Sequence, residues 1–179
     1  MEDMTKKSYL ELKKKLLETS SKPPLRKVFF TFGRFNPPTI GHFENIDEVF
    51  SYDGDHYIFV SKTEDSNKNP LSIETKLEIL KAARPDYADF IISATDDWPS
   101  VPQLVNEFLI KRAQYDSITM LVGEDRVDDF KALFERSKKE WPEIQELNVV
   151  SSGKRKSSVS ATNMREWAKN GDYEKYQNG

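Results

Sequence analysis

The segment KVFFTFGRFNPPTIGH, residues 27–42, determines the fold that we expect for this chain. Its first six residues, 27–32, form an apolar run of the length and composition typical of a buried strand. A loop containing glycine and proline follows over residues 33–39, and a helix is predicted from about residue 41 to residue 50. The segment therefore predicts a strand, a loop and a helix, which together begin a βαβ unit.

The rest of the chain repeats this alternation of short apolar strands and amphipathic helices. Further strands are predicted at residues 56–60, 90–93, 117–122 and 147–150. Further helices are predicted at residues 72–83 (with Ser72 as N-cap), 101–113, 125–136 and 160–169. We therefore expect an α/β fold with a five-stranded parallel sheet and helices on both of its faces. In such sheets ligands bind beyond the carboxyl ends of the strands.

An N-terminal extension precedes this pattern. A short amphipathic helix over about residues 8–19 is indicated by the spacing of Leu10, Leu12, Leu16 and Leu17. The breakers of SSKPP, residues 20–24, end it. We divide the chain into a helical extension at residues 1–24, which could pack on the domain or on a partner, and a domain at residues 25–179.

Composition excludes several classes of protein. The net charge is 27 − 30 = −3 and the pI is near 5.6, which argues against a general nucleic-acid binder. The absence of cysteine excludes disulfides and thiolate catalysis, and two histidines do not favour a zinc site. No apolar run approaches the roughly 20 residues of a membrane span. We expect a cytoplasmic protein that does not bind membranes.

The loop after the first strand has the features of a phosphate site. Thr39 and His42 are three residues apart across a helix start, so both can face one ligand. Gly41 removes side-chain bulk between them, and Gly33 leaves the end of the strand open to close approach. The helix N-terminus adds N–H groups and the positive end of a dipole.

A second candidate phosphate segment lies near the end of the chain. Three cations, Lys154, Arg155 and Lys156, precede a hydroxyl-rich helix start. Ser160 and Thr162 can cap this helix, and Arg165 lies a turn and a half farther along it. Two such segments in this order, with a βαβ pattern between them, indicate a nucleoside-triphosphate site.

Together these motifs resemble those of the nucleotidylyltransferase α/β-phosphodiesterase superfamily. The shared features are a strand, a G-x-F-x-P loop (residues 33–37), T-x-G-H (residues 39–42) and a closing S-x-T-x-x-R segment (residues 160–165). The resemblance extends from about Lys27 onward and is greatest to nicotinamide-mononucleotide adenylyltransferases and short phage-encoded relatives. Thr39 stands where many members have histidine, and Ala161 replaces a serine of the usual closing motif.

The resemblance implies a Rossmann-like fold and transfer of AMP from ATP to a phosphate-bearing acceptor, with release of pyrophosphate. It implies catalytic roles for His42, Thr39 and Arg165. Nucleotide-binding roles follow for Gly33, Arg34, Phe35, Gly41, Gly123, Asp125, Arg126, Ser160 and Thr162. Asp125 serves equally well as a helix N-cap. The triphosphate is expected to bring Mg²⁺ that is largely water-coordinated, with no metal site built by the protein.

The acceptor is predicted from weaker signals. Asn69 lies in a partial match to a stretch that leads toward the acceptor in the nicotinamide-nucleotide branch, and Arg34 is placed to bind the acceptor phosphate. Trp98, after the third strand, can stack on a flat ring or pack within its loop. These residues favour nicotinamide mononucleotide as acceptor and NAD as product.

Two other functions stay open at this stage. One is a cytidylyltransferase that acts on a phosphorylated alcohol; the other is a non-catalytic nucleotide-binding interaction module. An aminoacyl-tRNA synthetase is disfavoured because 179 residues leave no room for a tRNA-binding body. A homo-oligomer is possible because many relatives of the superfamily form one.

Overall fold

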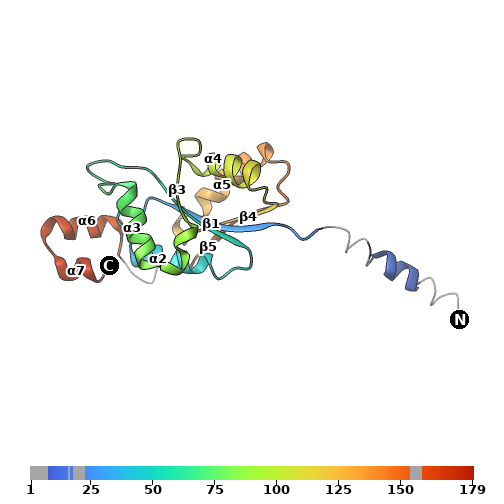
Figure 1. The fold of residues 1–179 in the computed structure, drawn as a ribbon, viewed down its shortest axis with the longest axis horizontal. Helices are drawn as coiled ribbons and strands as arrows, with labels where there is room; N and C mark the ends of the chain where they lie inside the picture. The colour runs from blue at the N-terminus through green and yellow to red at the C-terminus, as the bar shows by residue number, and fades with distance from the viewer. Residues whose placement is uncertain (1–7, 16, 18–22, 154–158) are drawn as a thin grey trace.

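A five-stranded, all-parallel sheet forms the centre of the domain (Figure 1). The structure is a computed structural model that describes residues 8–15, 17, 23–153 and 159–179. The strands are β1 (Lys27–Gly33), β2 (Asp55–Val60), β3 (Ile91–Ser93), β4 (Ser117–Val122) and β5 (Glu146–Ser151). Their order is β3-β2-β1-β4-β5, so β1 lies at the centre, with β2 and β3 on one side of it and β4 and β5 on the other. The predicted α/β fold is confirmed.

Helices cover both faces of this sheet, as predicted. The helices α2 (Ile40–Val49) and α3 (Ile73–Ala83) bury one face, and α4 (Val101–Gln103), the helix η2 (Leu104–Arg112) and α5 (Val127–Ser137) bury the other. The chain ends with α6 (Ala161–Asn170) and α7 (Tyr173–Gln177). Short 3₁₀ turns are η1 (Pro85–Phe90), η3 (Glu124–Arg126) and η4 (Lys138–Glu140).

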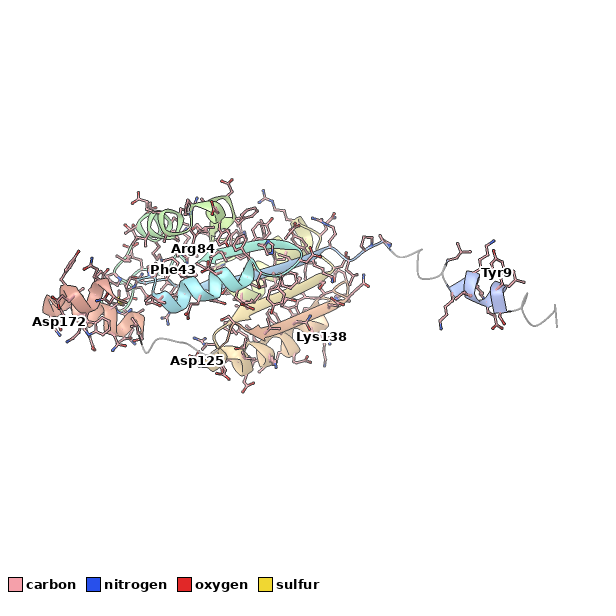
Figure 2. The ribbon with its side chains drawn as sticks, turned by 90° about the horizontal axis from the view of Figure 1, so that it is seen from below. Tyr9, Phe43, Arg84, Asp125, Lys138 and Asp172 are labelled. Carbon is pink, nitrogen blue, oxygen red and sulfur yellow. The ribbon has the colours of Figure 1, made fainter. Side chains whose placement is uncertain are left out.

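Side chains also tie the two helices of the first face to each other. Arg84, at the end of α3, forms two hydrogen bonds with the carboxylate of Asp47 on α2, at 2.6 and 2.7 Å. Its guanidinium lies 5.0 Å from the centre of the Phe43 ring, and Figure 2 shows these two side chains together. These contacts fix α2, which begins at the T-x-G-H segment, against its neighbour.

The helix predicted at residues 101–113 differs from a regular α-helix. After one α-turn it continues as a π-helix over Leu104–Arg112, with Ala113 N–H donating to the Phe108 carbonyl at 2.8 Å. Its buried residues are Leu104, Val105, Leu109 and Ile110. Hydrogen bonds in a π-helix join residues five apart, and its turn is wider than that of an α-helix. The pairs Leu104–Leu109 and Val105–Ile110 therefore lie on the same buried face.

Two further boundaries differ from prediction, and the predicted Ser72 cap is confirmed. Phe90 belongs to η1 rather than to β3, and the helix predicted from Asp125 begins with the 3₁₀ turn η3. Ser72 caps α3 by accepting a hydrogen bond from Thr75 N–H at 3.2 Å. Gly171 ends α6 in the left-handed conformation, with φ of 73°.

The N-terminal extension is helical over residues 8–15, in agreement with the predicted helix. Its apolar side chains Tyr9, Leu10 and Leu12 are each more than half exposed. The division of the chain between residues 24 and 25 stays a prediction. That this helix packs on a partner also stays a prediction. None of the described helices is both long and apolar enough to cross a membrane.

Two adjacent residues of α3 test how the helix is held on the sheet. Leu80 is fully buried, whereas Ile79 is 38% exposed. We expect Leu80→Ala to lower the free energy of unfolding by about 2–5 kcal/mol, because it removes buried apolar surface and leaves a cavity. Ile79→Ala is the control and should change it by about 0.5 kcal/mol or less. Urea denaturation of both variants measures this, and equal effects would contradict the described packing of α3.

Candidate active site

One cavity of about 610 Å³ lies at the carboxyl ends of the strands. Residues that follow β1, β2, β4 and β5 line it, among them Arg34, Ser61, Gly123 and Ser152. The T-x-G-H segment and Ser160 to Arg165 both contribute to its wall, although more than 115 residues separate them in the sequence. Its size is in the range of small-molecule sites.

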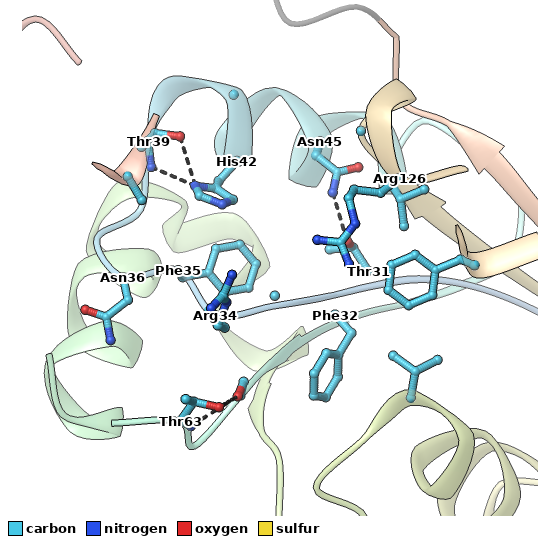
Figure 3. A pocket seen from close by; sticks show the side chains of 18 of the residues that line it. Thr31, Phe32, Arg34, Phe35, Asn36, Thr39, His42, Asn45, Thr63 and Arg126 are labelled. Atoms are coloured by element: carbon cyan, nitrogen blue, oxygen red, sulfur yellow. Dashed lines mark hydrogen bonds between the residues drawn. The ribbon is translucent and has the colours of Figure 1, made fainter. Parts of the chain in front are cut away.

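His42 is held in one orientation by the N-cap of its own helix. Its Nδ1 accepts a hydrogen bond from Thr39 N–H at 3.0 Å and lies 2.9 Å from the Thr39 hydroxyl oxygen (Figure 3). A backbone N–H can only donate, so the neutral imidazole must carry its proton on Nε2. Thr39 is 4% exposed, so it holds the His42 ring from the side that faces the protein interior. The arrangement gives His42 a fixed N–H donor.

Phe35 explains why glycine is required at the end of β1. Its backbone adopts a left-handed conformation with φ of 48°, which is uncommon for a bulky residue. This conformation folds its ring over Gly33, where an added Cβ would meet the ring at 2.8 Å. The ring centre also lies 5.1 Å from that of His42. The left-handed residue of this turn is therefore Phe35, and Gly33 provides the space that its ring occupies.

Arg165 connects the two halves of the site. Its Nη1 donates to the Asn36 carbonyl at 2.7 Å, and its Nη2 donates to the Thr162 hydroxyl at 3.2 Å. Ser160 caps α6 by accepting from Asn163 N–H at 3.1 Å, as predicted for this residue. The start of α6 is therefore fixed against the loop that follows β1.

Asn36 extends this connection to the loop after β2. It is 2% exposed, and its side chain exchanges two hydrogen bonds with the backbone of Leu71, at 3.0 and 3.2 Å. Asn69, two residues earlier, lines the cavity and donates through its side chain to Asp65. The Asp65 carboxylate also accepts from the N–H groups of Asn67 and Lys68. Loop and cavity wall are thus one connected unit.

Positive charge dominates the cavity. Arg34 after β1, Arg126 in η3 and Arg165 on α6 all line it, together with the His42 donor. Figure 3 shows Arg34 and Arg126 directed to the same opening. Among the lining residues in the described part of the chain, Glu44 is the only acidic one. Such an arrangement suits a ligand with several phosphate groups.

Not every predicted residue reaches the cavity. Trp98 is 7% exposed and packs on Phe59 and Phe108, with ring centres 5.6 and 5.5 Å away, so it belongs to the core rather than to an acceptor site. Asp125 is exposed in η3 and does not line the cavity, and Thr162 reaches it only through Arg165. The predicted residues that do line it are Gly33, Arg34, Phe35, Thr39, Gly41, His42, Asn69, Gly123, Arg126, Ser160 and Arg165.

Lys154, Arg155 and Lys156 lie outside the residues that the structure describes. The helix start at α2 was expected to offer its N–H groups to a phosphate. The N–H of Ile40, its first residue, instead donates to the Gly179 carbonyl at 2.9 Å, so part of this helix end is used within the chain.

The cavity also contains residues that the sequence did not single out. Asn45 lies one helical turn after His42, and its Nδ2 donates to the Thr31 hydroxyl at 2.8 Å, while its buried Oδ1 has no hydrogen-bond partner among the described residues. The i+3 spacing from His42 was a signal for this residue. An apolar wall consists of Phe32, Pro99, Val101, Pro102, Phe130 and Leu133. It draws on β1, on the segment from Pro99 into α4 and on α5, so no local pattern could indicate it.

No cluster of three or more histidine, aspartate or glutamate side chains suited to a metal occurs within the part of the chain that the structure describes. The described cavity therefore offers donors and cations to a ligand rather than a set of carboxylates to an ion. A divalent ion that enters with a polyphosphate is compatible with this arrangement, because such ions retain water ligands and bind the phosphates.

The Asp65 turn gives a pH-dependent test of the loop. Hydrogen bonds from Lys68 N–H and the Asn69 side chain lower the pKa of Asp65 to about 2, from an ordinary value of 3.8. A lowered pKa in the folded state stabilises the protein above the unfolded value, and the contribution is lost as the pH falls through about 2. Asp65→Ala should therefore lower the melting temperature at pH 7, and its difference from wild type should shrink between about pH 4 and pH 2.

Asp97→Ala serves as the control, because Asp97 is an exposed carboxylate on another loop. Asp97→Ala should leave the melting temperature close to that of wild type at pH 7 and at pH 2. A difference between wild type and Asp65→Ala that stays constant down to pH 2 would contradict the assigned role of the carboxylate.

Three solved structures with the same fold are named as adenylyltransferases of nicotinate or nicotinamide nucleotides. A proposed nicotinate-nucleotide adenylyltransferase from Vibrio parahaemolyticus is 15% identical, with a TM-score of 0.57 over 82% of this chain and 89% of that one. The nicotinic acid mononucleotide adenylyltransferase of Plasmodium falciparum, complexed with NaAD, is 10% identical, with a TM-score of 0.54 over 79% and 83%. These likenesses confirm the Rossmann-like fold.

A third structure is a bifunctional NMN adenylyltransferase/ADP ribose pyrophosphatase from Francisella tularensis. It is 20% identical, with a TM-score of 0.58 over 83% of this chain and 43% of the longer one. A search of curated protein sequences gives no match. The family model described as cytidylyltransferase-like matches residues 30–167, which is well over half of the chain. The resemblance to the nucleotidylyltransferases is thereby confirmed, and the chain belongs to the cytidylyltransferase-like family.

Proposed function

We propose that this protein is a nucleotidyltransferase that transfers AMP from ATP to the phosphate of a small acceptor and releases pyrophosphate. The supporting observation is that the oriented His42 donor and three arginines line one cavity together with the start of α6. The best candidate for the acceptor is nicotinamide mononucleotide, which would yield NAD.

The proposed reaction requires no covalent intermediate. An oxygen of the acceptor phosphate forms a bond to the α-phosphorus of ATP, and the bond from that phosphorus to the bridging oxygen breaks. Pyrophosphate leaves with the electron pair of the broken bond. The protein then has to align two anions and stabilise the charge on the phosphoryl oxygens.

Each part of the cavity has a role in this proposal. His42, oriented by Thr39, donates from Nε2 to an oxygen of the triphosphate around the α- and β-phosphates. Arg165 and the start of α6 at Ser160 hold the leaving pyrophosphate, and Arg34 binds the acceptor phosphate. Mg²⁺ carried by the triphosphate supplies further charge neutralisation.

The apolar wall supports an acceptor with a flat ring. Phe32 on β1 and Pro99 and Val101, which follow β3, line the cavity on the β3 side of the sheet. Aromatic side chains bind flat rings by stacking, whereas an acyclic alcohol leaves this surface in contact with water. These residues replace Trp98 in the proposal. The Plasmodium and Francisella structures, named for pyridine mononucleotides, point to the same class of acceptor.

A second candidate function follows from the family model, whose description is cytidylyltransferase-like. That activity would use CTP and a phosphorylated alcohol. The acceptor screen that separates the two measures pyrophosphate release with ATP or CTP. Its acceptors are nicotinamide mononucleotide, nicotinate mononucleotide, phosphopantetheine and flavin mononucleotide. We expect release with ATP and a pyridine mononucleotide.

No signal with either pyridine mononucleotide would overturn the proposed acceptor, and a preference for CTP would overturn adenylyl transfer. Tight binding of ATP without pyrophosphate release from any acceptor would support the non-catalytic nucleotide-binding module instead.

The two histidines of the chain provide a matched test of mechanism. His42→Ala removes the oriented donor and should lower turnover by about a hundredfold or more, as for loss of one transition-state donor. His56→Ala is the control: His56 lies on β2, bonds through Nε2 to the Tyr52 carbonyl at 2.7 Å, and does not line the cavity. Turnover in His56→Ala should remain within about twofold once the folded fraction is equal, a change of at most about 0.4 kcal/mol. Near-normal turnover in His42→Ala would refute the assigned role.

A further inference from the structure

Lys76 on α3 is fully buried, although lysine is among the residues least often found inside proteins. Its ammonium donates to the carbonyl oxygens of Ser61, at 2.6 Å, and Thr63, at 3.1 Å. These residues form the turn that leaves β2, and both line the cavity. Lys76 itself does not line it. The ammonium therefore lies directly behind one part of the cavity wall.

Burial of this ammonium is costly to the fold. Desolvation lowers the pKa of Lys76, and the charges of Glu64 and Glu74 oppose that shift. A methionine would occupy a similar volume without a charge, and replacing buried ionic groups by apolar ones of similar size is often neutral or stabilising. Stability of the core alone therefore does not account for lysine at this position.

The turn that Lys76 holds carries two hydroxyl groups. Ser61 Oγ lies 2.6 Å from Thr63 Oγ1 and accepts from Thr63 N–H at 3.1 Å. Ser61 N–H in turn donates to the Gly33 carbonyl at 2.8 Å, which connects the turn to the end of β1. Two hydroxyls have two hydrogens, and the bond between them uses one. The other is available to an oxygen atom of a ligand in the cavity.

The strand order assigns this turn to one side of the site. β2 and β3 lie on one side of β1, and β4 and β5 lie on the other. Gly123 and Arg126, which follow β4, are thereby separated from Ser61 and Thr63 across the point where the order reverses. Two ligands bound along such an edge occupy opposite sides of this point. If ATP lies over β4 and β5, the acceptor lies over the Ser61–Thr63 turn.

We propose that Lys76 is a positioning residue whose ammonium fixes the Ser61–Thr63 turn so that its hydroxyl pair binds the phosphate-bearing acceptor. This inference rests on the proposed function for the identity of the ligand. Its first part, that Lys76 fixes the turn, does not depend on any ligand.

The first measurement is hydrogen–deuterium exchange without substrate. Lys76→Met should raise the exchange rate of the amides at residues 61–65 by about tenfold or more, which corresponds to about 1.4 kcal/mol of lost protection. Lys76→Arg, which retains charge and donors, should raise it less. Lys81→Met is the control, since Lys81 is an exposed lysine on the same helix, and it should leave exchange unchanged. Unchanged exchange in Lys76→Met would overturn the inference.

The second measurement is steady-state kinetics with ATP and nicotinamide mononucleotide. Lys76→Met should raise the KM of the acceptor about tenfold, which corresponds to about 1.4 kcal/mol, with the KM of ATP changed less than about twofold, since one ligand contact is weakened. Its melting temperature should stay within a few degrees of wild type, and Lys76→Arg should recover part of the affinity. Thr63→Ala should raise the same KM, and adding it to Lys76→Met should give less than the product of the two effects.

The outcomes separate the two proposals. Equal rises in both KM values, or a fully additive double variant, would overturn the positioning role. If Lys76→Met does not fold, exchange in Lys76→Arg decides: a rise confined to residues 61–65 supports the role, and exchange there equal to that of Lys81→Met overturns it. A wild type that releases no pyrophosphate, with the exchange result as expected, would refute the proposed function and leave Lys76 as the group that fixes the turn.

Discussion

The site depends on one buried residue, Asn36, which forms hydrogen bonds through both its side-chain amide and its backbone carbonyl. Its carbonyl accepts from Arg165, and its side chain exchanges two hydrogen bonds with Leu71. Three segments far apart in the sequence therefore meet at one residue that is 2% exposed. Because hydrogen bonds in a dry environment are costly to leave unmade, each segment constrains the other two. These contacts join three parts of the cavity wall at one residue.

The arrangement of the sheet explains how a chain of net charge −3 can hold a strongly positive cavity. The sheet brings Arg34, Arg126 and Arg165 to its carboxyl edge from three different connections, while Asp125 and Asp128 lie on exposed surface and Asp129 pairs with Arg126 at 3.5 Å. Net charge reports the whole surface, whereas ligand affinity depends on the few groups that line the site. The fold therefore gathers these three arginines at one edge of the sheet although they lie far apart in the sequence.

The sequence predicts the sheet and most of the phosphate segments, because buried strands are apolar runs and caps have local signatures. It cannot predict Trp98, since an aromatic residue after a strand looks the same whether its ring meets a ligand or, as here, Phe59 and Phe108 from distant elements. Lys76 was open to prediction. It shares the i, i+3, i+4 and i+7 positions with Ile73, Leu77 and Leu80 and thus lies on the buried face.

The π-helix at Leu104–Arg112 has a consequence for comparing this chain with its relatives. A π-helical stretch contains more residues per turn than an α-helix that spans the same distance. A relative with an α-helix here would reach β4 with fewer residues, and an alignment would place a gap between Gln103 and Ala113. Such a gap would mark a change in helix type on the far side of the core. Such a gap would not indicate a lost functional residue, because the α4 residues that line the cavity, Val101 and Pro102, come before it in the sequence.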